Sequence, residues 1–412
     1  MNLRLENRLT LRRLPVLGIL YVLSGSTYIT LLPSLYWLAV PGMLLMVPTI
    51  LYYMLGSFSK AGLRRGLFAY GFAAFVLASG LVRRDSMGPY FRIALVFLFA
   101  YYFTQEFRFS DFRKLYTGFT AAICLIDTGF YFVLQKTGGF SFFPVVTNSN
   151  GAGYHIGVLF NYMESHPERN TGIYWEPGLF ATMIVLAFVL ELLYEERISP
   201  WRAVIYHVCI FTTASSAGVV LMLLCDLILL NRLLNRFSDI GPIKYFFFVL
   251  LYLLLLAMLF YLDTVLTMTG LTKYRAFAKL LSGNIGGSAR LEALVKNWGL
   301  FLQHPAAGIG IGEAYRSATN FSDTSTTTFM MVEFGIMGLL PTVFVLRGIL
   351  GLKRELFENL NLITIFLCIL NKEPHMRIAI LWVLAFYFSR EREAQSASAA
   401  LCGEKIHEPV AV

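Results

Sequence analysis

Apolar stretches long enough to cross a bilayer recur along almost the whole chain. A spanning helix needs about 17–25 mostly apolar residues. Hydrophobic residues make up 57% of the 412 residues and charged residues only 14%, whereas a soluble domain carries roughly 25% charged residues. This imbalance excludes a soluble globular enzyme, a disordered chain and a collagen-like fibre. The sequence therefore predicts an all-α integral membrane protein.

We expect about twelve transmembrane helices, separated into three groups by two long loops. In chain order, the segments are helices 1–5 within residues 1–135, a first long loop at 136–176, helices 6–9 within 177–262, a second long loop at 263–325 with an amphipathic helix, helices 10–12 within 326–389, and a tail at 390–412. The apolar runs are 14–32, 33–55, 66–82, 90–104, 115–135, 177–194, 202–214, 216–231, 245–262, 326–346, 359–370 and 376–389.

Basic residues set the expected orientation. Lysine and arginine gather in the N-terminal segment, in the turns after even-numbered helices and in the tail. The positive-inside rule places these segments in the cytoplasm, so we expect both termini inside and both long loops outside. This distribution also accounts for the net charge of +9, and nucleic acid is not an expected partner. The five cysteines lie in apolar runs or in the tail, without C-x-x-C spacing, which predicts neither a disulfide framework nor a zinc site.

The end of the first long loop concentrates polar side chains just before an apolar run that begins at Pro177. Arginine can bind phosphate or carboxylate with two parallel hydrogen bonds, and a carboxylate can act as a base. An indole can stack on a sugar or a lipid headgroup. Each residue also has an ordinary interpretation, as a loop charge, a helix-start carboxylate or an interfacial aromatic. The candidates are His166, Arg169, Tyr174, Trp175 and Glu176.

Two further segments carry candidate residues. The turn FTTASSAG at 211–218 offers the hydroxyls of Ser215 and Ser216, which either line a headgroup site or bring two helices close together. The second loop contains a predicted amphipathic helix from Ser288 to Gln303, with Arg290 and Asn297 on one face toward an aqueous site. Leu291, Val295, Trp298 and Leu302 form its apolar stripe, and Lys296 and His304 are lesser candidates.

Gly308–Gly312 does not fit a nucleotide-binding motif, because Glu313 follows and no strand–helix unit surrounds it. We interpret it as a mobile or tight backbone turn. Asp127, His207 and Glu333 are ionisable residues within predicted spans, so they are functional candidates, although a helix–helix hydrogen bond is the alternative for each.

The order of these segments resembles the Wzy-type membrane polymerases of bacterial surface polysaccharides, which are relatives of the O-antigen ligases. The resemblance covers roughly residues 164–345, and it lies in Arg169-Asn170-Thr171-Gly172-Ile173-Tyr174-Trp175-Glu176-Pro177, in Thr213-Ala214-Ser215-Ser216-Ala217-Gly218, and in Arg290, His304-Pro305, Gly308-Ile309-Gly310 and Glu333-Phe334-Gly335. Two features depart from the ligase pattern: Ala217 follows Ser216 where many relatives have arginine, and Thr324-Ser325-Thr326 occupies the region where many have histidine.

The resemblance implies a GT-C-like bundle in the bacterial inner membrane that transfers an undecaprenyl-diphosphate-linked glycan onto a lipid-linked repeat unit at the periplasmic face. A chain-length-regulating membrane protein is a possible partner. No cofactor and no metal is expected, since neither loop carries D-x-D or a His/Asp cluster. The implied roles are diphosphate binding by Arg169 and Arg290, base or orienter for Glu176 with Glu333 second, and sugar or lipid contact by Tyr174 and Trp175.

Two other functions fit the same sequence. A ligase would use the same donor but attach the glycan to a lipid A core or a protein. A transporter or flippase of a lipid-linked or small anionic solute would instead place its charged residues at mid-membrane depth, facing a cavity.

Overall fold

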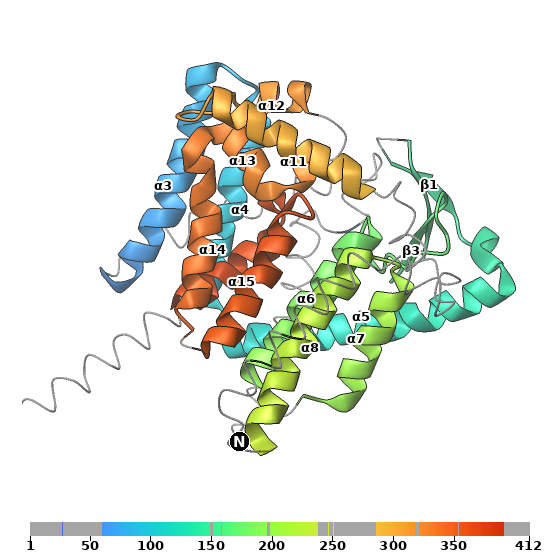
Figure 1. Cartoon of the computed structure of the whole chain (residues 1–412). Coiled ribbons are helices and arrows are strands. Elements are labelled where there is room, and N and C mark those ends of the chain that lie inside the picture. The colour runs from blue at the N-terminus through green and yellow to red at the C-terminus, as the bar shows by residue number, and fades with distance from the viewer. Residues whose placement is uncertain are drawn as a thin grey trace, which may run out of the picture. The chain divides into compact units, whose positions relative to one another are not determined.

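The computed structural model describes residues 60–148, 151–157, 159–195, 198–237, 286–318, 322–352 and 354–390, together with Thr27, Phe246 and Leu250. The chain forms two compact units, whose elements Figure 1 labels. Unit 1 comprises Met1–Gly25, Trp37–Phe112 and Lys296–Val412, and unit 2 comprises Ser26–Tyr36 and Arg113–Val295.

Within the described residues, six helical segments are long and apolar enough to cross a membrane. Each overlaps a predicted run, so the predicted helical class is confirmed, with helices that could span a membrane by their length and composition. The predicted runs at 202–214, 359–370 and 376–389 also form helices, but these are shorter: α7 (Pro200–Thr212), α15 (Leu356–Leu370) and Ala379–Arg390. The run at 33–55 and nearly all of the runs at 14–32 and 245–262 lie outside the described residues, and the total of twelve stays a prediction. The six segments are Gly66–Arg83, Met87–Gln105, Phe109–Thr137, Pro177–Tyr194, Ser216–Asn235 and Thr326–Leu350.

Unit 1 is built around a helical hairpin of α3 (Lys60–Arg83) and α4 (Met87–Glu106), which pack side by side. Its core is aromatic: Phe97 packs on Trp382 with ring centroids 4.5 Å apart, and Phe68 stacks on Phe344 at 4.1 Å. The rest of unit 1 comprises part of α11 (Gly286–Gln303), α12 (Ile311–Ser317), η5 (Ser322–Thr324), α13 (Thr326–Phe334), η6 (Gly335–Leu339), α14 (Leu340–Leu350), α15, η7 (His375–Arg377) and Ala379–Arg390.

The span Thr326–Leu350 is a broken helix. Gly335 adopts φ +65° at the end of α13, and Pro341 in the first turn of α14 has no N–H to donate. The carbonyls freed by the break accept hydrogen bonds from the glycine-rich turn: Ile309 N–H donates to Val332 O at 2.8 Å, and Gly310 N–H to Glu333 O at 3.0 Å. The segment Gly308–Gly312 is therefore a tight turn that completes the backbone bonding of a span.

Unit 2 surrounds α6 (Pro177–Tyr194), in which every residue from Pro177 to Leu193 is buried. Around it lie α5 (Phe109–Thr137), α7 and α8 (Ser216–Phe237). Gly218 lets α8 approach α6 closely, because a Cβ at this position would lie 2.7 Å from the Cβ of Ala181. Small residues at such crossings are typical of membrane helices.

The first long loop contains a sheet that the all-α prediction did not include. After the short helix η3 (Gly139–Phe142), β1 (Val145–Thr147), β2 (Gly153–Ile156) and β3 (Asn161–Met163) form an antiparallel sheet in the order β1-β2-β3. Val146 pairs with Tyr154, and His155 pairs with Tyr162. Phe160 and Tyr162 pack against Leu134 of α5, so the sheet anchors the loop that carries the predicted site.

Candidate functional site

The predicted first-loop motif folds as a turn between β3 and α6. Asn170 is fully buried in this turn, and its side-chain oxygen accepts the N–H of Gly172 at 3.0 Å. Gly172 adopts φ +56°, where a Cβ would lie 2.9 Å from the ring of Phe180. A left-handed backbone with no room for a Cβ requires glycine, which explains the glycine of the motif.

Arg169 joins the first-loop motif to the turn between α7 and α8. Its Nε donates to the carbonyl of Thr213 at 3.3 Å, and its side chain is half-buried. Asn170 N–H donates to the carbonyl of Thr212 at 3.0 Å. Two segments that the sequence predicts separately, 164–181 and 211–218, therefore meet in unit 2.

Glu176 and Trp175 lie half-buried at the start of α6, where Glu176 occupies the N-cap position with an extended backbone. Tyr154 of β2 donates its hydroxyl to Trp175 O at 3.2 Å. Burial raises the pKa of Tyr154, and the negative charge of Glu176 raises it further. This arrangement places Glu176 beside the positive end of the α6 dipole.

Two of the predicted contact residues are buried. Tyr174 is 1% exposed and stacks on Phe180 with ring centroids 5.4 Å apart, so it packs beneath the turn. Ser215 is also buried, and its hydroxyl accepts the N–H of Gly218 at 3.2 Å. This bond caps the first turn of α8, a structural role that the sequence did not indicate. Ser216, the first residue of α8, is half-buried.

His166 lies three residues before Arg169 in the same loop. Its Nδ1 is 3.5 Å from Oε1 of Glu168, and its side chain is 45% exposed. An exposed pair of this kind adds little stability. His166 therefore remains a surface residue at the margin of the turn.

The amphipathic helix of the second loop is present as α11, but its faces differ from the prediction. Val295, Trp298 and Leu302 are exposed, which fits an apolar stripe turned toward lipid. Asn297 is buried and donates to the hydroxyl of Thr328 at 3.1 Å, so its face packs on α13 and does not line an aqueous site. Arg290 falls on α11, and its side chain lies outside the described residues.

The other predicted residues of the second loop belong to unit 1. Lys296, within α11, and His304, directly after it, are exposed, and Glu333 is fully buried in the last turn of α13. A buried carboxylate in a membrane span is costly and is a functional candidate by default. In unit 1, Glu333 thus lies at the break of the span Thr326–Leu350.

A polar cluster that was not predicted lies on the turn between α3 and α4. Arg83 Nη2 donates to Ala307 O at 2.9 Å, and Tyr90 donates its hydroxyl to Asp85 Oδ2 at 2.6 Å. The same hydroxyl accepts the N–H of Ile311 at 2.8 Å. The available signal was the triplet Arg83-Arg84-Asp85 in a short turn predicted to lie outside, where arginine is disfavoured.

A second unpredicted cluster lies on the turn between α15 and the last helix. Lys372, Glu373 and His375 are all buried. The hydroxyl of Thr326 donates to Glu373 O at 2.7 Å and accepts the N–H of His375 at 2.8 Å. Burial, and then the positive charge of Lys372, lower the pKa of His375 to about 3. The signal in the sequence was three ionisable residues in the short stretch NKEPH between two apolar runs.

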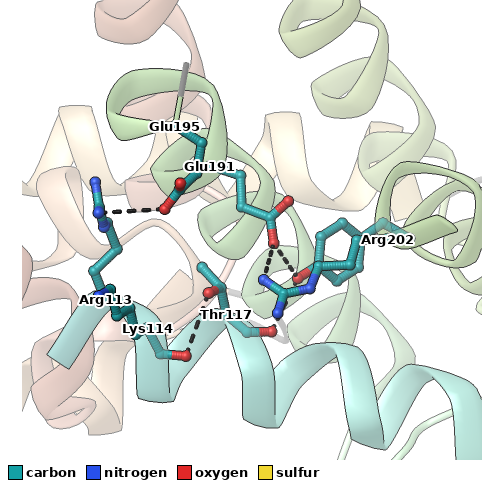
Figure 2. A network of polar contacts seen from close by, with 7 residues as sticks. Arg113, Lys114, Thr117, Glu191, Glu195 and Arg202 are labelled. Carbon is teal, nitrogen blue, oxygen red and sulfur yellow. Dashed lines mark hydrogen bonds and ion pairs between the residues drawn. The ribbon is translucent and has the colours of Figure 1, made fainter. Parts of the chain in front are cut away.

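A third polar network, drawn in Figure 2, lies at the end of α6 opposite Glu176. Glu191 is buried, and its Oε1 accepts hydrogen bonds from Arg202 Nη1 at 3.0 Å and from the Tyr206 hydroxyl at 3.2 Å. Arg113 pairs with Glu195 at 3.2 Å. These contacts join α5, α6 and α7, and none involves a predicted site residue.

The other ionisable residues predicted within spans are also engaged in unit 2. Asp127 is fully buried in α5, and Tyr162 donates to its Oδ1 at 3.4 Å. Nε2 of His207 lies 3.1 Å from both carboxylate oxygens of Asp226, and Nδ1 faces Ala203 O at 2.7 Å. The His207–Asp226 contact is a helix–helix bond between α7 and α8, as the structural alternative for His207 predicts, whereas Asp127 bonds to a residue of β3.

Neither metal-binding groups among the described residues nor similarity to known proteins indicates a function. Among the described residues, no group of three or more histidine, cysteine or carboxylate side chains is placed to hold a metal ion. Comparison with known protein families, curated proteins and solved structures gives no match.

Proposed function

We propose that this chain is a polymerase of bacterial surface polysaccharide. It transfers an undecaprenyl-diphosphate-linked glycan onto a lipid-linked repeat unit at the periplasmic face of the inner membrane. The observation that carries the proposal is the hydrogen bond from Arg169 Nε to Thr213 O, which joins two motifs of the resemblance in unit 2.

The chemistry needs a cation and a base. The acceptor hydroxyl oxygen bonds to the anomeric carbon of the donor, the bond from that carbon to the diphosphate oxygen breaks, and the hydroxyl proton goes to a base. Negative charge grows on the departing lipid diphosphate, and a positioned guanidinium stabilises it. Arg169 takes this role, and Glu176, seven residues later at the start of α6, is the base or the group that orients the sugar.

A glycan ladder on a gel tests the proposal in a deletion strain complemented with wild type, Arg169→Ala, Arg169→Lys or Arg113→Ala. We expect wild type and Arg113→Ala to restore long polymer, because Arg113 pairs with Glu195 away from the motif. Both Arg169 variants should leave single repeats at normal protein levels, since lysine cannot form two parallel hydrogen bonds. Arg290→Ala is expected to behave in the same way. Full-length polymer in Arg169→Ala would refute the diphosphate role.

One observation favours the transporter alternative. The span Thr326–Leu350 is broken beside the buried Glu333, and broken helices hold substrates or ions in many secondary transporters. In that case the deletion strain would retain its repeat units on the cytoplasmic side. Protection of these units from an externally added glycosidase separates the two functions.

A further inference from the structure

Asn170, the residue after Arg169, bonds to the turn and to α7 through three of its polar groups. Its side-chain nitrogen donates to the hydroxyl of Thr212 at 2.9 Å, and its side-chain oxygen accepts the N–H of Gly172 at 3.0 Å. Its backbone N–H donates to Thr212 O at 3.0 Å. A buried amide is tolerated when its groups are satisfied, and here they tie the turn to the end of α7.

A second asparagine holds the turn from the other side. Asn161 of β3 donates its side-chain nitrogen to Gly172 O at 2.7 Å and to Tyr174 O at 2.8 Å. The hydroxyl of Thr171 donates to Asn161 Oδ1 at 3.1 Å. The backbone from Thr171 to Tyr174 is therefore fixed before any substrate arrives.

Arg169 and Asn170 both form hydrogen bonds to the end of α7. Arg169 binds the carbonyl of Thr213, and Asn170 binds the carbonyl and hydroxyl of Thr212. The two residues thus form hydrogen bonds to neighbouring peptide groups at the end of α7. Loss of the Asn170 contacts would free the turn to move relative to α7 and displace the Arg169 side chain.

We propose that Asn170 is a positioning residue, which fixes the guanidinium of Arg169 for the diphosphate of the lipid-linked donor. The inference rests on the proposed function. Its physical basis is preorganisation: a cation held by a rigid, fully bonded support binds an anion without first being ordered. Asn170 itself does not touch the substrate.

The test measures the equilibrium affinity of the purified protein in lipid nanodiscs for undecaprenyl diphosphate, which reports on the site without turnover. Arg169→Ala should raise the Kd by about tenfold or more, and Asn170→Ala by about tenfold, since one to two hydrogen bonds of support are lost. Thr212→Val should raise it about fivefold, and Thr212→Ser, which keeps the hydroxyl, should restore it to within about twofold of wild type.

The double variant Arg169→Ala/Asn170→Ala distinguishes positioning from general destabilisation. If Asn170 acts through Arg169, the double variant should bind no more weakly than Arg169→Ala, to within about twofold. Asn231→Ala and Thr117→Val are matched controls in unit 2, because both residues are buried and lie in α8 and α5, outside residues 164–181 and 211–218. These two controls should leave the Kd unchanged.

The remaining outcomes would overturn either the proposed function or the positioning role of Asn170. Absence of undecaprenyl diphosphate binding by wild type would overturn the proposed function, and this inference with it. Unchanged binding by Asn170→Ala, with weakened binding by Arg169→Ala, would overturn the positioning role alone. A multiplicative loss in the double variant, or an equal loss in Asn231→Ala, would also overturn it, because both indicate a general effect on folding.

Discussion

The network in Figure 2 contains two ion pairs of different burial, and we predict that their contributions to stability differ severalfold. The side chains of Arg202 and Glu191 are 32% and 2% exposed, and those of Arg113 and Glu195 are 15% and 42% exposed. The perturbation is a pair of double-mutant cycles, with alanine at each of the four positions. The two pairs share one network, so each serves as the control for the other.

The expected magnitudes follow from burial. Charge-assisted hydrogen bonds contribute about 1.5–3 kcal/mol, and the buried Glu191 also accepts the Tyr206 hydroxyl at 3.2 Å. Because the Arg202 side chain is partly exposed to solvent, we expect a coupling energy of about 2 kcal/mol for the Glu191–Arg202 pair. Glu195 is well exposed, so the Arg113–Glu195 coupling should be about 0.5 kcal/mol, within the range of surface pairs.

The assay is reversible unfolding of the single and double variants in mixed detergent micelles, at low salt and in 0.5 M salt. Salt should remove most of the Arg113–Glu195 coupling and leave most of the Glu191–Arg202 coupling, since buried pairs are screened far less. Equal coupling energies, or loss of the Glu191–Arg202 coupling in salt, would refute the reasoning.

Three further predictions concern unit 1 and α11. The pKa of His375 is lowered to about 3 from about 6.5 in an unfolded chain, so the unfolded state binds more protons at acid pH. Wild type should then lose about 2 kcal/mol of stability between pH 7.5 and pH 5 that His375→Phe does not lose, and parallel pH profiles would contradict this. The Gly308→Ala substitution should lower the free energy of unfolding by more than about 2 kcal/mol, because Gly308 has φ +67° and an added Cβ would lie 2.5 Å from Gly335 N. Gly299→Ala is the matched control in thermal unfolding, since a Cβ added there would lie in open space. In a variant that retains Trp298 as its single tryptophan, brominated lipids should quench the fluorescence, and unquenched emission would place the α11 stripe away from lipid.

The spans were predictable because a long apolar run is a local property of the chain. Residues 177–194 were assigned as one span from composition, and α6 has these bounds. The short strands at Val145–Thr147 and Asn161–Met163 were missed because three residues carry too little periodicity to indicate a strand.

The candidate site was predictable only in part. Arg169 was singled out by its chemistry, but its partner is a backbone carbonyl, which no sequence pattern marks. Ser215 and Tyr174 have side chains that suit a binding site, and tertiary packing uses them as a cap and a stacked ring. Asn170 and Asn161 were not named as candidates, because their role lies in hydrogen bonds to residues 42 and 11 positions away, which no local pattern marks.

The broken span in unit 1 has a consequence for the order of synthesis. Backbone carbonyls without partners are strongly disfavoured in hydrocarbon, and Val332 and Glu333 obtain theirs from Ile309 and Gly310. Residues 309 and 310 leave the ribosome before residues 326–350, so the donors already exist when this span enters the bilayer. A circular permutant that delivers the span first would place unsatisfied carbonyls in the membrane, and its insertion would stall until the turn arrived.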